Sequence, residues 1–160
     1  MNKAVLLSIK PVWCSKILLK EKTVEVRKTK PKIMEPPFKC YVYCTKERSK
    51  MDWLRMVPGK GWQRLDGAVI GEFVCDKIWE LAPICRAPDD VEEMACMDRD
   101  HIVHYLNKCH GWAWHISDLK IYNNPRKLEE FTGLQRTRFG MQPFEVQRPP
   151  QSWCYVEELK

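Results

Sequence analysis

Apolar residues in this chain occur in short segments of strand length, and this pattern limits the fold more than any other feature of the sequence. Two stretches, Pro11–Lys20 and Asp98–Lys108, have the apolar spacing of short helices. Because helices and strands do not alternate along the chain, we expect an α+β, mostly β fold: a small, mostly antiparallel β-barrel with flanking short helices. The predicted strands are Ala4–Ile9, Thr23–Arg27, Lys39–Lys46, Ala68–Leu81, Trp112–Tyr122 and Ser152–Leu159.

Three single residues indicate where these elements begin, bend or end. Pro11 suits the first turn of a helix, where its missing N–H group would have no partner in any case. Gly71 is predicted as a β-bulge inside the strand 68–81. Gly111 is predicted to end the helix that starts at Asp98.

The length of 160 residues suits one domain with a sizeable core, so we expect a single domain over residues 1–160. Its polar and basic segment 47–67 is predicted as a flap or insertion. The apolar run at Ala4–Ile9 is too short for a signal peptide and meets Lys10 and Pro11 at once. No apolar run approaches the ~20 residues that cross a bilayer. We therefore expect a cytoplasmic protein without membrane contact.

The chain is mildly basic, with 27 Lys+Arg against 21 Asp+Glu and a net charge of +6. This balance fits a partner that carries phosphates but does not require one. Its eight cysteines stand mostly among apolar neighbours, as in "EFVCDKI" and "SWCYVEE". In a reducing compartment they are predicted to be free thiols rather than disulfides.

The segment "KEKTVEVRK" is unusually charged for a strand that enters a core. Side chains alternate along a strand, so Val24 and Val26 point to one face while Thr23, Glu25 and Arg27 point to the other. Lys22 precedes the strand, and its amine can reach the polar face. Two interpretations follow from this spacing: a solvated face with a surface ion pair between Glu25 and Arg27, or the wall of a functional cleft.

The surrounding run "SIKPVWCSKILLKEKTVEVRKTKP" resembles the signature of the ASCH domain family, Gly-x-Lys-x-x-Glu-x-Arg after a short helix. Lys22, Glu25 and Arg27 occupy the Lys, Glu and Arg places, and Lys20 stands where the family has its glycine. The later segments "DGAVIGEFVCD", "AWHISDLKIY" and "RPPQSWCYVEEL" resemble the family's following strands and a subset encoded by phages and prophages. The resemblance covers nearly the whole chain.

This resemblance implies a PUA-like fold in which the motif lines a cleft beside the barrel and contacts RNA or a nucleoside. Basic side chains at the cleft would contact phosphates, and an aromatic ring would stack on an exposed base. For each tryptophan the alternative is core packing, which we favour for Trp79 and Trp153. The predicted RNA- or nucleoside-binding residues are Lys10, Trp13, Lys22, Thr23, Glu25, Arg27, Lys28, Trp62 and Ser117.

Hydrolysis is the alternative function. Some proteins of the ASCH type resemble small amidohydrolases that act on N4-acetylcytidine, and others are described as ribonucleases. The resemblance then implies that Lys22 is a nucleophile or base, and the amidohydrolase pattern has a threonine at the place of Glu25. Glu25 stands between two cations, which should keep it ionised, so it could orient Lys22 or act as a weak base. Binding and catalysis in the same cleft both remain open at this point.

A metal site is a third possibility, since His101, His104, Cys109, His110 and His115 share one short segment. Neither this segment nor the pair Cys40 and Cys44 has a standard zinc spacing. We therefore predict no metal and no cofactor. The tetrapeptide "PGKG" also lacks the flanking residues of a phosphate-binding P-loop.

Overall fold

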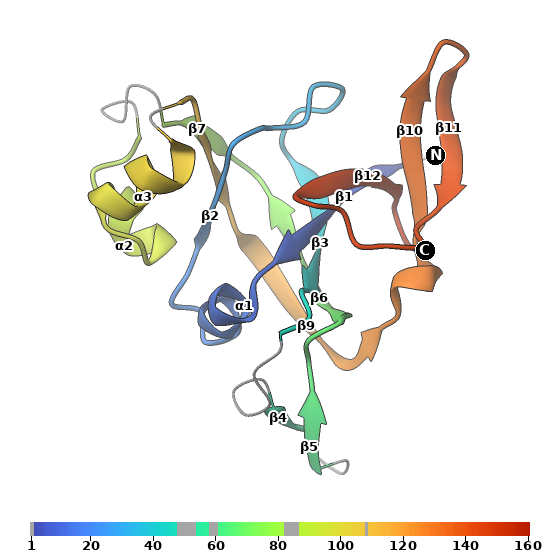
Figure 1. Ribbon diagram of the computed structural model, residues 1–160, viewed down its shortest axis with the longest axis horizontal. Helices are drawn as coiled ribbons and strands as arrows, with labels where there is room; N and C mark the ends of the chain where they lie inside the picture. The colour runs from blue at the N-terminus through green and yellow to red at the C-terminus, as the bar shows by residue number, and fades with distance from the viewer. Residues whose placement is uncertain (1, 48–53, 58–60, 82–86, 108) are drawn as a thin grey trace. The chain divides into compact units, whose positions relative to one another are not determined.

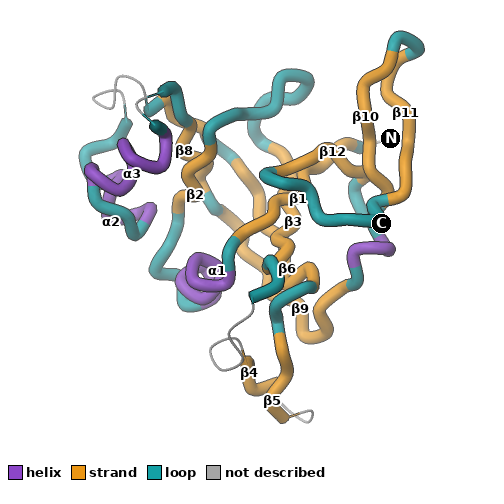
Figure 2. Tube along the Cα trace, viewed as in Figure 1, coloured by secondary structure: helices purple, strands orange, loops and turns teal. Residues whose placement is uncertain are grey.

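The computed structural model describes residues 2–47, 54–57, 61–81, 87–107 and 109–160. Strands predominate over short helices, so the mostly β, α+β class is confirmed (Figures 1 and 2). The chain forms two compact units. The sheet unit comprises residues 1–15, 39–73 and 119–160, and the motif unit comprises residues 16–38 and 74–118. The prediction of one domain over residues 1–160 stays a prediction.

A seven-stranded mixed sheet, in the order β11-β10-β12-β1-β3-β6-β9, forms the frame of the sheet unit. The first strand, β1, pairs parallel with β3 and antiparallel with β12, and the other pairings whose register is described are antiparallel, as expected for a mixed, mostly antiparallel fold. Among the described strands no pairing between β11 and β9 closes this sheet into a barrel. Its strands are β1 (Lys3–Ile9), β3 (Phe38–Cys44), β6 (Ala68–Cys75), β9 (Ser117–Arg126), β10 (Thr132–Thr137), β11 (Gly140–Glu145) and β12 (Trp153–Glu157).

Apolar residues from neighbouring strands of this sheet make the core of the sheet unit. The rings of Tyr41 and Phe131 meet edge to face with their centroids 5.0 Å apart, next to Leu6 and Val156. The Tyr41 hydroxyl accepts a hydrogen bond from the Leu159 N–H at 2.8 Å, so its polar end is satisfied where the ring is buried. The 3-10 helix η2 (Leu128–Glu130) leads from β9 into this core.

The motif unit contains a three-stranded sheet of β2 (Val24–Arg27), β8 (Trp112–His115) and β7 (Ile78–Glu80). Two helices accompany it, α2 (Val91–Ala95) and α3 (Arg99–Leu106). The helix α1 (Pro11–Leu18) precedes β2 and begins at its proline, as predicted. None of the described helices is long and apolar enough to span a membrane.

The ends of α3 differ in part from the prediction. Its N-terminus is capped by Asp98, whose carboxylate accepts a hydrogen bond from the His101 N–H at 2.7 Å. Its C-terminus is capped by Asn107 in the left-handed conformation, with φ of 50°, so the prediction that Gly111 ends the helix is wrong. A Cβ atom at Gly111 would lie 2.4 Å from the Leu106 side chain, so a larger residue there would force that side chain to move.

Two predicted strands, 68–81 and 112–122, are each divided between the two sheets. The first becomes β6 and β7, and the second becomes β8 and β9, so both predictions of a single strand are wrong. Long apolar runs do not reveal such a change of sheet, because alternation continues on both sides of the break. Gly71, predicted as a bulge, lies inside β6, where a Cβ atom would stand 2.6 Å from the Lys120 carbonyl oxygen.

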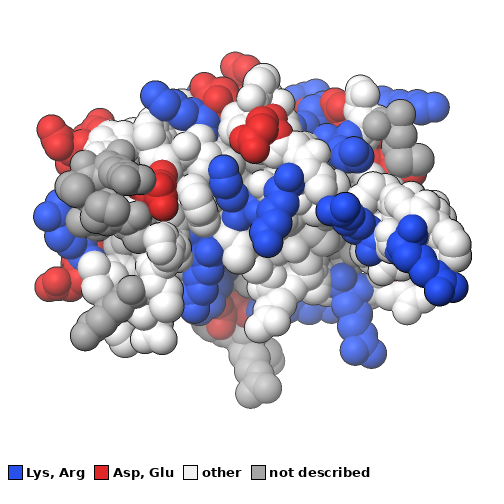
Figure 3. Space-filling view, turned by 90° about the horizontal axis from the view of Figure 1, so that it is seen from above, with Lys and Arg blue, Asp and Glu red and all other residues white. Residues whose placement is uncertain are grey.

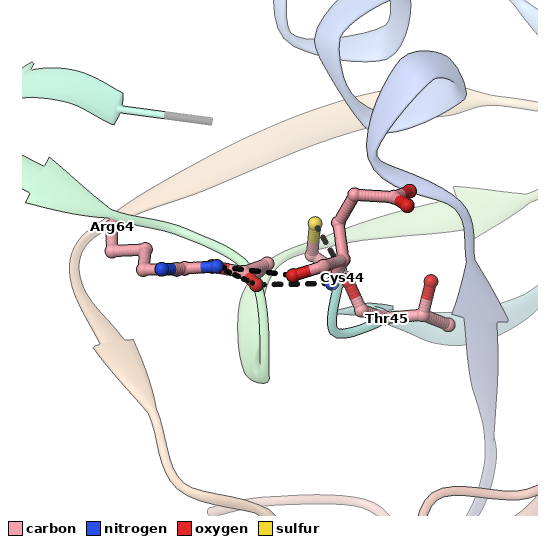
Figure 4. A network of polar contacts seen from close by, with 5 residues as sticks. Cys44, Thr45 and Arg64 are labelled. Atoms are coloured by element: carbon pink, nitrogen blue, oxygen red, sulfur yellow. Dashed lines mark hydrogen bonds and ion pairs between the residues drawn. The ribbon is translucent and has the colours of Figure 1, made fainter. Parts of the chain in front are cut away.

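The predicted flap, 47–67, contains the antiparallel strands β4 (Leu54–Val57) and β5 (Gly61–Arg64), which form a sheet of their own. Residues 48–53 and 58–60 of this segment lie outside the described residues. A polar network closes its base (Figure 4): Arg64 forms a bidentate ion pair with Asp66, and Asp66 accepts from the Glu47 N–H at 3.1 Å. Next to it, the Gly67 N–H donates to the Cys44 carbonyl at 2.7 Å.

Candidate functional site

The pairing of β2 with β8 decides which side chains share a face. Glu25 lies opposite Trp114 and Arg27 opposite Trp112, so these four side chains are on one side of the sheet. The two valines of β2 are on the other side. Trp114 is completely buried and Trp112 is half-buried. The predicted separation of a valine face from a polar face is confirmed.

Glu25 joins the two basic residues of the motif. Its Oε1 atom lies 3.0 Å from Arg27 Nη2, and its Oε2 atom lies 3.4 Å from Lys22 Nζ. The Lys22 ammonium also donates a hydrogen bond to the Ala95 carbonyl at 2.7 Å. Oε2 is buried and ion-paired with Lys22, but it accepts no hydrogen bond from the described residues, so the carboxylate has unused acceptor capacity. We call Lys22, Glu25 and Arg27 the motif network.

The motif network is buried, which excludes a solvated strand face. Relative exposures are 2% for Lys22, 6% for Glu25 and 6% for Arg27. Surface ion pairs contribute little to stability, but buried charges are costly unless they are paired and hydrogen-bonded. Each member of the network has a charged partner within 3.4 Å, as this cost demands.

The turn between α1 and β2 places Lys22 at the head of this network. Lys20 adopts the left-handed conformation, with φ of 61°, at the position where the ASCH pattern has a glycine. The Glu21 and Lys22 N–H groups both donate to the Lys16 carbonyl, at 3.0 Å and 3.1 Å. A lysine therefore makes the same kind of tight turn that a glycine would favour.

Tyr105, on α3, is a site residue that the sequence analysis missed. Burial raises the pKa of its hydroxyl, while the charge of Arg27 lowers it and that of Glu25 raises it. The ammonium of Lys28 stands 5.3 Å from the centroid of its ring. In the same unit Lys30 lies 4.8 Å from the ring of Trp112. The only sequence signal for Tyr105 is its place on a short amphipathic helix.

The other predicted site residues fall in different places. Thr23 is half-buried, and its main chain bonds to Met94 and Ile116. Ser117 donates to the Val74 carbonyl at 2.8 Å. Exposed Lys10 and half-buried Trp13 belong to the sheet unit. The side chain of Trp62 lies outside the described residues.

Histidines and cysteines do not gather into a metal centre among the described residues. His115 Nδ1 lies 2.6 Å from Asp76 Oδ1, and His110 Nδ1 lies 3.4 Å from Glu80 Oε1. The seven cysteines that the structure describes are free thiols, and Cys85 lies outside the described residues.

A pocket of about 540 Å³ lies in the sheet unit beside η2 and β11, between Phe131 and Phe144. It contains none of the predicted site residues, so it does not identify the functional site. Separate Lys and Arg side chains are visible among neutral and acidic residues on the face drawn in Figure 3, in keeping with the net charge of +6.

The fold is similar to that of solved ASCH structures. No family model and no curated protein sequence matches the chain. The ASCH protein from Zymomonas mobilis is 17% identical, with 97% of this chain and 88% of that chain covered and a TM-score of 0.62. A tyrosine-to-phenylalanine variant of that protein is 15% identical, with coverage of 97% and 91% and a TM-score of 0.55. At such low identity the similarity shows the fold alone.

Proposed function

We propose that this chain is a PUA-like ASCH domain that binds RNA or a modified nucleoside at its motif network. The observation that carries this proposal is the burial of Lys22, Glu25 and Arg27 in contact with one another. Two valines already supply the apolar face of β2, so the strand does not need its two charged side chains, or Lys22 before it, for its packing. The ASCH-like fold supports the same proposal. Membership of a phage or prophage subset stays a prediction.

The charge of the network favours an anionic partner. Two basic side chains share one carboxylate, which leaves a formal excess of one positive charge in a buried place. Burying an ion away from water costs on the order of several kcal/mol. The negative charge of a bound phosphate would attract the excess positive charge and so offset part of this cost. Lys28 and Lys30, each held over an aromatic ring of the same unit, supply further positive charge.

The buried Glu25 oxygen that accepts no hydrogen bond from the described residues favours contact with a base edge. A carboxylate oxygen accepts hydrogen bonds from exocyclic amino groups such as that of cytosine. Oε2 of Glu25 has this capacity, and Lys22 and Arg27 hold the carboxylate in one orientation. The proposed ligand is therefore a nucleotide or nucleoside that offers a donor to Glu25.

Glu25→Gln is the test of this proposal. The amide keeps the shape of the side chain but offers a single acceptor oxygen, so we expect weaker binding of cytidine and of single-stranded RNA by calorimetry. Glu21→Gln is the matched control, because Glu21 is exposed and its side chain forms a surface pair with Lys16 at 3.5 Å. Equal binding by the parent and Glu25→Gln, with the protein folded, would contradict the proposal.

Hydrolysis in the same place is the second candidate function. It is favoured by the position of the Lys22 amine, 3.4 Å from a carboxylate oxygen that could orient it. Incubation with N4-acetylcytidine, followed by detection of cytidine and acetate, tests the amidohydrolase. Incubation with single-stranded RNA, followed by detection of shortened products, tests the ribonuclease. Turnover by the parent that is lost in Glu25→Gln would support catalysis, whereas binding without turnover would support the binding domain.

A further inference from the structure

The distal half of the β10–β11 hairpin is not packed into the core. Gly133 and Leu134, near its base, are buried, but no residue from Gln135 to Gln142 is buried. The antiparallel register continues nevertheless to the pair Thr137 and Gly140 at the turn. Figure 1 shows the hairpin as a long projection of its sheet. A two-stranded ribbon in water is marginally stable by itself, so core packing does not account for this extension.

The turn of the hairpin presents an aromatic ring to solvent. Phe139 is 75% exposed, the highest value among the exposed large apolar residues that the structure describes. The Thr137 hydroxyl fixes the turn, because it accepts from the Phe139 N–H at 3.1 Å and donates to the Gly140 carbonyl at 3.1 Å. The Arg138 guanidinium stands 4.7 Å from the centroid of the phenyl ring. The ring is therefore held outward and accompanied by a positive charge.

The charge and the edge of the hairpin indicate what it can contact. Segment 132–144 contains two arginines and no acidic residue, and both Arg136 and Arg138 are exposed. Strand β11 is the outer strand of its sheet, but Pro143 lacks the N–H group with which an added strand would pair. Contacts through side chains are therefore favoured over pairing with another strand.

We propose that the hairpin tip is a second nucleic-acid contact, in which Arg136 and Arg138 bind phosphates and Phe139 stacks on a base of a single strand. Guanidinium groups match phosphate oxygens in a bidentate manner. An exposed aromatic ring next to these arginines can stack on an unpaired base of a single strand. The bases of a duplex are already stacked on their neighbours and offer no free face to the ring. This contact uses no residue of the motif network, so each contact can fail without the other.

The experiment measures anisotropy of a labelled single-stranded oligouridylate over a series of salt concentrations. Phe139→Ala should weaken binding by about fivefold or more, the effect of losing one stacked base. The double variant Arg136→Gln, Arg138→Gln should reduce the slope of log K against log salt by about 1.4, or ~0.7 for each lost phosphate. Arg148→Gln is the matched control: it removes an exposed arginine outside the hairpin and should bind like the parent.

Several outcomes would overturn the hairpin contact. Parent-like affinity and salt dependence in the hairpin variants would do so, and so would an equal loss in Arg148→Gln. Vesicles of phosphatidylserine test a lipid surface: binding to vesicles that needs Phe139, together with unchanged oligouridylate binding, also contradicts the proposal. Weakened RNA binding in the hairpin variants, with Glu25→Gln unaffected, would support the hairpin contact and contradict the function proposed for the motif network. Each variant at an exposed residue should have the same thermal unfolding midpoint as the parent, which would confirm that the variant is folded.

Discussion

Lys22 donates a hydrogen bond to the main-chain carbonyl of Ala95 at 2.7 Å, which connects the start of β2 to the last residue of α2. A carbonyl at the end of a helix has no partner within that helix, and a cation is favourable there. The same ammonium lies 3.4 Å from Glu25. Lys22 therefore has a structural role as well as a place in the proposed site.

We expect Lys22→Met to destabilise the protein. Methionine keeps most of the side-chain volume, but the Ala95 carbonyl loses a buried donor and Glu25 loses one of its two charged partners. The lost donor alone costs about 1–3 kcal/mol. Lys22→Ala should cost more, because it also leaves a cavity. Urea unfolding measures both. Lys16→Met is the control, since the pair of Lys16 with Glu21 is exposed and its loss should cost about 1 kcal/mol or less. A Lys22→Met variant as stable as the parent would contradict a stabilising role for the contacts of Lys22 with Ala95 and Glu25.

Tyr105 should report on the charges of the motif network. Burial holds the pKa of its hydroxyl above the usual value of about 10. Glu25 raises this pKa further and Arg27 lowers it. Titration of tyrosines carrying a carbon-13 label should therefore show a lower Tyr105 pKa in Glu25→Gln and a higher one in Arg27→Gln. Identical titration in both variants would mean that Tyr105 does not sense the network.

Two substitutions of Tyr105 distinguish the role of its hydroxyl from the role of its ring in positioning Lys28. Tyr105→Phe keeps the ring beneath Lys28 and removes only the hydroxyl, whereas Tyr105→Leu removes both. We expect the first change to weaken cytidine binding with little change in the salt dependence of RNA binding. The second should also reduce that salt dependence, because Lys28 loses the ring that holds it. Calorimetry and anisotropy measure the two effects.

The base of the β4–β5 hairpin should be sensitive to acid. The hydrogen bond from Arg64 holds the pKa of Asp66 below its ordinary value of 3.8, although burial opposes this shift. A carboxyl group with a lowered pKa in the folded state stabilises the fold above its unfolded pKa. This contribution is lost as the pH falls through the folded value. Free energies of unfolding between neutral pH and pH ~3 should therefore depend less steeply on pH in Asp66→Asn and in Arg64→Gln than in the parent.

The cysteines should all be reduced, and two of them should react slowly. Burial raises the pKa of Cys75 to about 12 and that of Cys154 to about 11, so few thiolates form there at neutral pH. A thiol reagent should modify exposed Cys109 first. In denaturant, freshly purified and unreduced protein should yield eight thiols, and a smaller number would reveal a disulfide. Because the folded state raises these two pKa values, the two thiols stabilise the fold below pH about 9. This contribution to the free energy of unfolding is lost as the pH rises from about 9 toward the pKa values of the folded state.

Several elements were predictable because their signals are local. Strand β1 and helix α1 follow from a short apolar run and the proline after it, and β2 follows from strict alternation. The hairpin of β10 and β11 was missed, because its distal half has no alternation between apolar and polar residues. The breaks inside 68–81 and 112–122 were missed because the apolar pattern is the same on both sides of each break.

The sequence alone determined that β2 has a valine face and a charged face, because side chains of a strand alternate whatever surrounds them. It also determined the spacing that sets Glu25 within reach of both Lys22 and Arg27. Only the tertiary structure decided that the charged face is buried, since burial depends on strand β8 and helices α2 and α3, which are distant in the chain. For the same reason only the tertiary structure brought the Ala95 carbonyl and Tyr105 to the network. Alternation is a property of neighbouring residues, whereas burial and partners come from segments that meet only when the chain has folded.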